Sequence, residues 1–227
     1  MISKDALGFF KVIGVSGLAG SGKDLFYSLC KKELISKKIN CCSIAIAGQL
    51  KKEIDQTIQR IHGFSLFDCD RNQKDLVRDL LVFYGAVKRN GTKGRYWVKK
   101  AEKTIQAMHL NCITQSINKP VLFVTDVRYD EYPKDEVHWI KEELLGKLVH
   151  IRRFDAEILL DPLYQLPTGD YKKIYQNPPN SSERTNDPKL QKAADILIEW
   201  QTQKGSLKSI EKKLSPVAKE FVQSYCL

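Results

Sequence analysis

The sequence predicts an α/β fold in which helices cover both faces of a parallel sheet. Short apolar runs rich in β-branched residues, typical of strands buried on both faces, occur at intervals along the chain. Between them lie segments whose apolar residues recur every three or four positions, as in amphipathic helices. Parallel strands need crossover connections, and helices supply them. We therefore expect one three-layer α/β/α domain over residues 1–227, built on a five-stranded parallel sheet.

The first half of the chain is expected to hold two strands and four helices. The strands are predicted at 9–16 and 41–47, and the helices at 23–37, 50–61, 73–87 and 97–112. In the third helix the apolar residues are spaced so that one face is expected to point inward. That face consists of Leu76, Leu80, Phe83 and Val87.

The second half is expected to complete the sheet. Strands are predicted at 121–124, 147–151 and 196–198, and an acidic helix at 134–145. The stretch 160–188 is rich in Pro, Asn, Asp and Ser and has no periodicity, so it is predicted to be a mobile loop or lid.

Charge and cysteine content narrow the classes of function. Thirty-seven Lys and Arg against 27 Asp and Glu give a net charge of +10, which indicates anionic partners without separating nucleic acid, nucleotides and lipid. The six cysteines lack metal-ligand spacing and are expected to be reduced thiols. No secretory signal and no long apolar run is present, so we expect a cytoplasmic protein without a membrane partner.

A glycine-rich motif, GLAGSGKD, follows the first predicted strand and opens the first predicted helix. Its spacing is that of a P-loop, in which backbone N–H groups and the helix N-terminus surround phosphate and the lysine reaches the β- and γ-phosphates. A glycine-rich turn that merely caps a helix would not need the lysine. The predicted ATP-binding residues are Gly17, Gly20, Ser21, Gly22, Lys23 and Asp24.

Two carboxylates are candidate ligands for Mg²⁺. Asp24 stands where P-loops usually carry Ser or Thr, and it either binds the metal or simply favours the helix N-terminus. Asp126 ends the buried run VLFVTD, at the edge of the sheet where ligands bind in open α/β folds. Arg128 follows two residues later and serves either as the ion-pair partner of Asp126 or, as we favour, as a phosphate clamp.

The sequence contains no Ser-His-Asp, Cys-His or paired-carboxylate pattern, and His150 is expected to be a packed residue. A phosphate monoester acceptor would need no base, because its second pKa is about 6. It would need Mg²⁺ and several cations. The candidate cations are Lys23, Arg78, Arg128, Arg152 and Arg153, of which Lys23, Arg128 and Arg152 are the predicted catalytic residues.

One face of the third helix is a candidate acceptor site. Arg78, Val82 and Gly85 are spaced to lie together, roughly opposite the apolar face, and the glycine leaves room for a ligand. A solvent-exposed arginine is the alternative. Trp97 either stacks against a base or forms the apolar start of the fourth helix.

These pieces together resemble the deoxynucleoside monophosphate (dNMP) kinases of bacteriophages. The matching segments are SGKD, AGQLKKEI, KDLVRDLLVFYG, GRYWV, TDVRY with DEVHW, LVHIRR and SSERTNDP. The resemblance implies transfer of the ATP γ-phosphoryl group to a dNMP in a host cell, for viral DNA synthesis. With it we expect a nucleotide-binding helical insertion at about 48–118. The stretch 160–188, together with the preceding Arg152 and Arg153, suggests a lid at about 152–190, and a homodimer stays open.

The resemblance also implies site residues. Aspartate is usual in this family after the loop lysine, as at Asp24. The family pattern also suggests an acid after Arg128, for which we prefer Glu136 to Glu131, and it includes Glu183 without giving it a role. The implied substrate-binding residues are Asp24, Arg78, Gly85, Trp97, Asp126, Arg128 and Glu136.

Two alternative functions stay open. One is a P-loop kinase of another acceptor, of the phosphomevalonate or dephospho-coenzyme A type. The other is a P-loop ATPase that binds nucleic acid, although no motif of a nucleic-acid-binding family occurs and no stable partner of that kind is expected. Its basic surface would consist of Lys88, Arg89, Lys93, Arg95, Lys99, Lys100 and Lys103.

Overall fold

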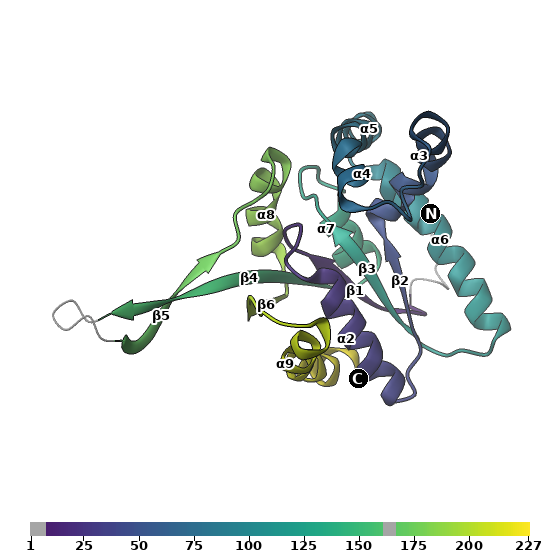
Figure 1. Ribbon diagram of the computed structural model, residues 1–227. Helices are drawn as coiled ribbons and strands as arrows, with labels where there is room; N and C mark the ends of the chain where they lie inside the picture. Colours follow the sequence, from purple (N-terminus) through teal and green to yellow (C-terminus); the bar gives the residue numbers. More distant parts are fainter. Residues whose placement is uncertain (1–7, 161–166) are drawn as a thin grey trace.

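The computed structural model describes residues 8–160 and 167–227, and within them it shows a six-stranded sheet (Figure 1). Five strands run parallel in the order β2–β3–β1–β4–β6, which confirms the predicted P-loop-type α/β/α fold. Their bounds are Lys11–Ser16 for β1, Cys41–Ala45 for β2, Val121–Val127 for β3, Lys147–Leu160 for β4 and Ile196–Gln201 for β6.

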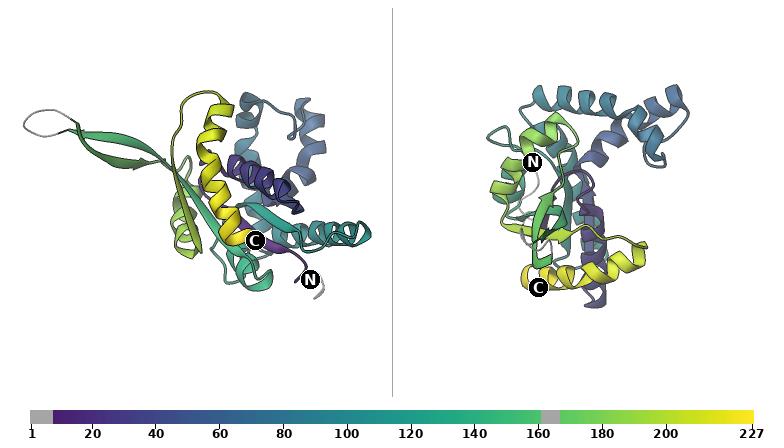
Figure 2. Two further views of the ribbon diagram at one scale, coloured as in Figure 1. Left: turned by 90° about the horizontal axis from the view of Figure 1, so that it is seen from below. Right: turned by 60° about the vertical axis from the view of Figure 1, so that its left-hand side comes forward.

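Helices cover both faces of the sheet. On one face α2 (Lys23–Ser36) lies beside α9 (Leu207–Phe221), which continues into η2 (Val222–Cys226), as Figure 2 shows. Their apolar side chains form a core with β1 and β3 that includes Phe26, Phe123 and Phe221. The core of the other face includes Trp97, Val98 and Ile105 from α6 (Arg95–Thr114) and Trp139 from η1 (Trp139–Glu143).

The part of the helical insertion that precedes α6 lies beyond the carboxyl end of β2, and α6 runs back beside the sheet (Figure 1). The insertion contains α3 (Ile46–His62), α4 (Arg71–Leu76), α5 (Arg78–Asn90) and α6. The predicted third helix is two helices, because Asp70 and Gln73 form a capping box that starts α4 and the chain turns at Val77 before α5 begins.

The predicted inward face of the third helix is wrong. Leu76, Leu80, Phe83 and Val87 are 68%, 42%, 68% and 52% exposed. Val77 is instead buried against Ile54 and Ile58 of α3, and Leu81 and Tyr84 pack on the same cluster. Apolar residues occur on both sides of this segment, so their periodicity alone did not determine which side is buried.

Most of the described part of the predicted loop, residues 167–188, is a strand and a helix. β4 pairs antiparallel with β5 (Pro167–Tyr175), and the two strands form an arm that projects from the body (Figure 1). Helix α8 (Ser181–Ala193) follows, capped by Asn180. It was missed because it is mostly polar and contains Pro188. Residues 161–166, within the predicted loop, lie outside the described residues.

The predicted acidic helix is a single turn, α7 (Glu136–His138), that continues into the π-helical η1. The side chain of Asp135 caps it by accepting a hydrogen bond from the Glu136 N–H. Among the described helices none is both long and apolar enough to cross a membrane.

The packing of α5 can be tested by truncating one side chain on each face. Val77→Ala should lower the free energy of unfolding by on the order of 2 kcal/mol, because it removes buried methyl groups. Phe83→Ala should change it by less than about 0.5 kcal/mol, because the ring is exposed. Urea denaturation measures both. An equal loss in the two variants would mean that the face of Phe83 is buried in solution.

Candidate active site

The P-loop joins β1 to α2 and takes a conformation that requires glycine. Gly17, Gly20 and Gly22 have φ values of 133°, 81° and 97°, which side-chain-bearing residues rarely adopt. A Cβ atom on Gly17 would lie 2.4 Å from the Ile151 carbonyl oxygen. One on Gly22 would lie 2.4 Å from Cζ2 of Trp200. The loop is therefore packed tightly against Ile151 in the first half of β4 and against Trp200 near the carboxyl end of β6.

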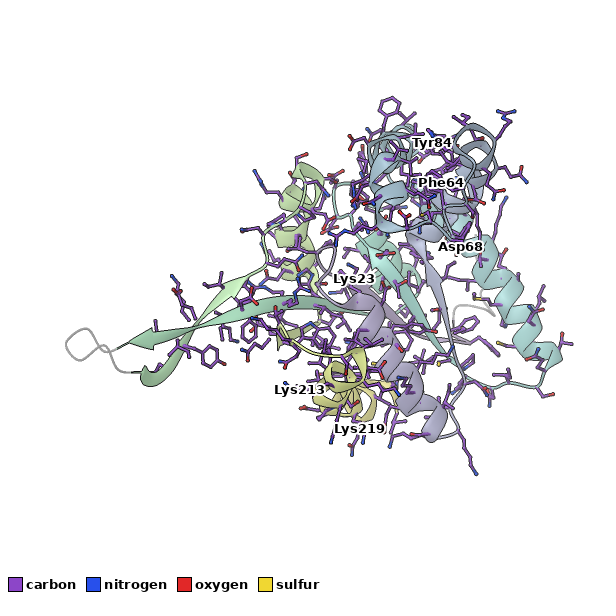
Figure 3. The ribbon with its side chains drawn as sticks, viewed as in Figure 1. Lys23, Phe64, Asp68, Tyr84, Lys213 and Lys219 are labelled. Carbon is purple, nitrogen blue, oxygen red and sulfur yellow. The ribbon has the colours of Figure 1, made fainter. Side chains whose placement is uncertain are left out.

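Lys23 lies at the start of α2, inside this loop (Figure 3). Its Nζ donates hydrogen bonds to the carbonyl oxygens of Gly17 and Leu18, both at 2.8 Å. The side chain is buried, and burial lowers the pKa of the ammonium, an effect that the nearby carboxylate of Asp126 opposes. Asp24 follows in the first turn of the helix.

Three side chains from the C-terminal part of the chain hold the loop from outside. The Trp200 indole donates to the Ser21 carbonyl at 2.8 Å. Glu183 accepts from the Ala19 N–H at 2.7 Å, and the Gln176 amide donates to the Ala19 carbonyl at 2.6 Å. Sequence reasoning missed Trp200 and Gln176, and the only available signal was the position of Trp200 two residues after the last predicted strand.

Asp126 has a left-handed backbone conformation within β3, with φ of 61°. Aspartate tolerates this conformation better than most residues do, although it is strained, and such strain is common at functional sites. Opposite it, the β1–β3 register shifts between Gly14 and Ser16. The Asp126 carboxylate lies 3.4 Å from Nη2 of Arg128, so the ion pair that the sequence allowed is present.

Glu136 supports the turn after β3. One of its oxygens accepts hydrogen bonds from the N–H groups of Arg128 at 2.6 Å and Tyr129 at 3.2 Å. The side chain is 2% exposed, and burial raises its pKa to about 8. Glu131, the other candidate acid, instead binds Arg89 and Asn186.

A cavity of about 710 Å³ brings most of the predicted residues together. It extends from the P-loop, past the end of β3, to the helical insertion. Its lining includes Gly20, Gly22, Lys23, Asp24, Arg78, Gly85, Trp97, Asp126, Arg128 and Glu136. Sequence reasoning missed three further polar side chains that line it, those of Lys51, Lys74 and Tyr129.

At the insertion end of the cavity, Gly85 and Trp97 have packing roles. A Cβ atom on Gly85 would lie 2.8 Å from Cδ1 of Leu50, so the glycine allows α3 and α5 to approach each other. The Trp97 indole donates to the Gly85 carbonyl at 3.2 Å and is 4% exposed. Trp97 thus belongs to the core and still contributes to the cavity wall. Arg78 is half exposed and pairs with Asp75.

Arg152 lies elsewhere, beside a second cavity of about 110 Å³ that Ser21 and Arg153 also line. Its guanidinium is 3.5 Å from the centroid of the Tyr175 ring, and Nη1 is 3.2 Å from Glu199. Gly17 is not among the lining residues of either cavity.

The fold brings Ser16, His150 and Asp187 into a row that the sequence did not suggest. His150 Nδ1 is 3.0 Å from Ser16 Oγ, and Nε2 is 3.6 Å from Asp187. Ser16 is fully buried and also donates to the Val149 carbonyl at 3.1 Å, so it is not placed as a nucleophile. Burial lowers the pKa of His150 to about 4, and the ring is a packed neutral group.

The carboxylates of Asp24 and Asp126 are hard oxygen donors in the wall of the large cavity, and they suit Mg²⁺. Among the described residues no group of three or more His, Cys, Asp and Glu side chains could hold a metal ion. This is compatible with Mg²⁺, which usually takes one or two carboxylates together with substrate phosphates and water.

Comparison with known proteins gives only distant likenesses. No family model and no curated protein sequence matches the chain. Among solved structures, a dephospho-CoA kinase from Campylobacter jejuni has a TM-score of 0.41 at 15% identity, covering 94% of this chain and 98% of its own. A protein from Thermus thermophilus has a TM-score of 0.39 at 16% identity, covering 93% and 98%. The fold assignment therefore rests on the strand order and the loop geometry described above.

The buried carboxyl of Glu136 should make stability depend on pH. Its pKa is about 8 in the folded protein against an ordinary 4.5, so the folded state holds this proton more tightly. The resulting stabilisation is complete below about pH 4.5 and is lost as the pH rises through about 8.

Glu136→Gln, which imitates the protonated group, should therefore raise the melting temperature relative to the unmodified protein at pH 8.5 and have little effect at pH 5. Glu220→Gln, at an exposed position of α9, is the control and should leave the melting temperature unchanged at both pH values. A melting-temperature difference that is the same at both pH values would contradict the assignment.

Proposed function

We propose that this protein is an ATP- and Mg²⁺-dependent dNMP kinase that produces dNDP and ADP. The observation that carries the proposal is the single cavity that joins the P-loop lysine to a second group of cations on the helical insertion. That second group consists of Lys51, Lys74 and Arg78. Two polyanions that must react in line need cationic contacts at both ends of one site.

The chemistry suits an acceptor that is itself a phosphate. Its attacking oxygen is already ionised near pH 7, so the site needs no general base. Lys23 and Arg128 would neutralise charge on the transferred group, and Arg78 would hold the acceptor phosphate. Mg²⁺, when bound through Asp24 and Asp126, would supply further charge neutralisation. Catalysis would then depend mainly on positioning the two phosphate groups, and a preformed cavity favours this.

The rest of the cavity suits a nucleoside. Apolar side chains of Leu50, Leu81 and Val82 form part of its wall together with Trp97. A volume of about 710 Å³ falls in the range of small-molecule sites. The resemblance to bacteriophage dNMP kinases supports the choice of a deoxynucleotide, and with it a role in dNTP supply in a host-cell cytoplasm.

In this proposal residues 48–118 bind the monophosphate and residues 152–190 act as the lid. The β4–β5 arm and Arg152 belong to that lid. Arg152 and Arg153 lie beside the P-loop residue Ser21, next to the smaller cavity, where they could reach ATP.

The nucleic-acid alternative loses support from the structure. Arg89 is 3% exposed and pairs with Asp135, so it cannot contact a polyanion. Arg95 forms two hydrogen bonds to Glu143, at 2.6 and 2.8 Å. Lys88 and Lys100 both lie near Glu53. Four of the seven cations of that surface are thus already engaged within the protein.

A substrate panel tests the proposal. With ATP and Mg²⁺, at least one of the four common dNMPs should give dNDP, and Lys23→Ala should lower the rate at least about 100-fold because a cation at the transferred phosphate is lost. Chromatography of the nucleotides measures the products. Phosphomevalonate and dephospho-coenzyme A are run in parallel. Turnover of one of these and of no dNMP would contradict the proposal.

Arg78 tests which end of the cavity binds the acceptor. Arg78→Ala should raise the KM for dNMP about 10- to 100-fold, the value of one or two charge-assisted hydrogen bonds. The KM for ATP should change less than about two-fold. Arg71→Ala, an exposed arginine of the adjoining α4, is the matched control. A larger increase in the KM for ATP than in the KM for dNMP would mean that Arg78 lies at the ATP end of the site.

A further inference from the structure

Glu183 belongs to the motif SSERTNDP and has no role yet in the proposed reaction. It lies in the first turn of α8, and its side chain is 13% exposed. Oε2 accepts the Ala19 N–H of the P-loop at 2.7 Å. Oε1 lies 3.6 Å from Nη1 of Arg128. One carboxylate therefore contacts both the phosphate-binding loop and the proposed clamp.

The position of this carboxylate is fixed by its own helix. Asn180 caps α8 by accepting the Glu183 N–H at 2.8 Å, and its amide donates to Glu183 Oε1 at 3.2 Å. One turn later Asn186, which is 2% exposed, donates to Glu131 at 2.9 Å in the segment after β3. These bonds hold α8 against the part of the chain that carries Arg128.

Arg128 lies between two carboxylates. Nη2 is 3.4 Å from Asp126, Nη1 is 3.6 Å from Glu183, and Nε has no hydrogen-bond partner within the described residues. Asp126 is a candidate for Mg²⁺ binding in the proposed reaction, and its negative charge would then be shared with the metal. Glu183 is the carboxylate that would still hold the guanidinium in place.

We propose that Glu183 is a positioning residue for phosphoryl transfer, which sets the orientation of Arg128 and of the Ala19 turn of the P-loop. The inference rests on the proposed kinase function. A carboxylate so near the P-loop also repels phosphate, because like charges close together are unfavourable. Its contribution should therefore be to turnover and not to affinity for ATP.

Glu183→Gln separates these two quantities. The amide oxygen can still accept the Ala19 N–H, while the charge opposite Arg128 is lost. We expect kcat to fall about 10- to 100-fold, the cost of a misplaced catalytic group. The dissociation constant of ATP should stay the same or decrease. Glu211→Gln is the control, because it removes the same charge from an ion pair between Glu211 of α9 and Lys32 of α2. Both kcat and the dissociation constant of ATP should stay within about two-fold of the wild type in this variant.

A double-mutant cycle tests whether Glu183 acts through Arg128. If it does, adding Glu183→Gln to Arg128→Ala should lower kcat no further. A residue that only stabilises the fold would give the same loss in both backgrounds. Glu183→Asp keeps the charge on a shorter side chain, so its kcat should lie between those of the wild type and of Glu183→Gln. It replaces Glu183→Gln in the experiment if that variant does not fold.

Several results would overturn the inference. One is an unchanged kcat in Glu183→Gln. A second is tighter ATP binding with unchanged or faster turnover, which would make Glu183 an obstruction to ATP. A third is weaker ATP binding together with a lower melting temperature, as expected for a structural role. If the wild type phosphorylates no dNMP, the proposed function fails, and the same variants are then compared by their transfer of phosphate from ATP to water.

Discussion

The tight packing around the P-loop is the constraint on which the rest of the structure depends. Lys23 is bound to the loop's own carbonyl groups, and Gly22 lies against the Trp200 ring so closely that no side chain fits. Glu183 holds the opposite side of the loop through Ala19. The loop is thereby fixed by α2, by the last parallel strand and by the helix after the arm. Preorganised N–H groups need little rearrangement to receive phosphate, which is why this packing matters for catalysis.

Polar clusters then hold the helices of the insertion to one another and to the segment after β3. Glu53 accepts hydrogen bonds from the hydroxyls of Tyr84 and Tyr96, at 2.5 and 2.7 Å, and these bonds help to lower its pKa to about 2. On the other side Arg89 of α5 is buried with Asp135, and its guanidinium is 3.9 Å from the centroid of the Tyr129 ring. Buried ion pairs of this kind contribute little net stability because desolvation offsets their attraction. Their effect here is to determine where α5 lies, and so where Arg78 faces the cavity.

Sequence patterns predicted elements well where one signal was sufficient. The strands β1 and β3 are apolar runs whose pattern predicts only a buried strand. The spacing Gly, four residues, Gly, Lys after a strand is typical of one structure, the P-loop. Prediction failed where burial decides between equivalent faces, as at Phe83, or where a polar segment is ordered only by its contacts. Helix α8 is of the second kind, because it has few apolar side chains and is fixed through Asn186 and Glu183.

The sequence by itself determined the α/β class, the P-loop and the carboxylate at the end of β3, because each depends on residues that are close together in the chain. The tertiary structure decided which distant groups meet. It placed Glu136 rather than Glu131 behind Arg128, moved Arg152 away from the large cavity, and brought Glu183 to Ala19 across 164 positions of sequence. Contacts of that range arise from the packing of helices on the sheet, and no local pattern of residue types records them.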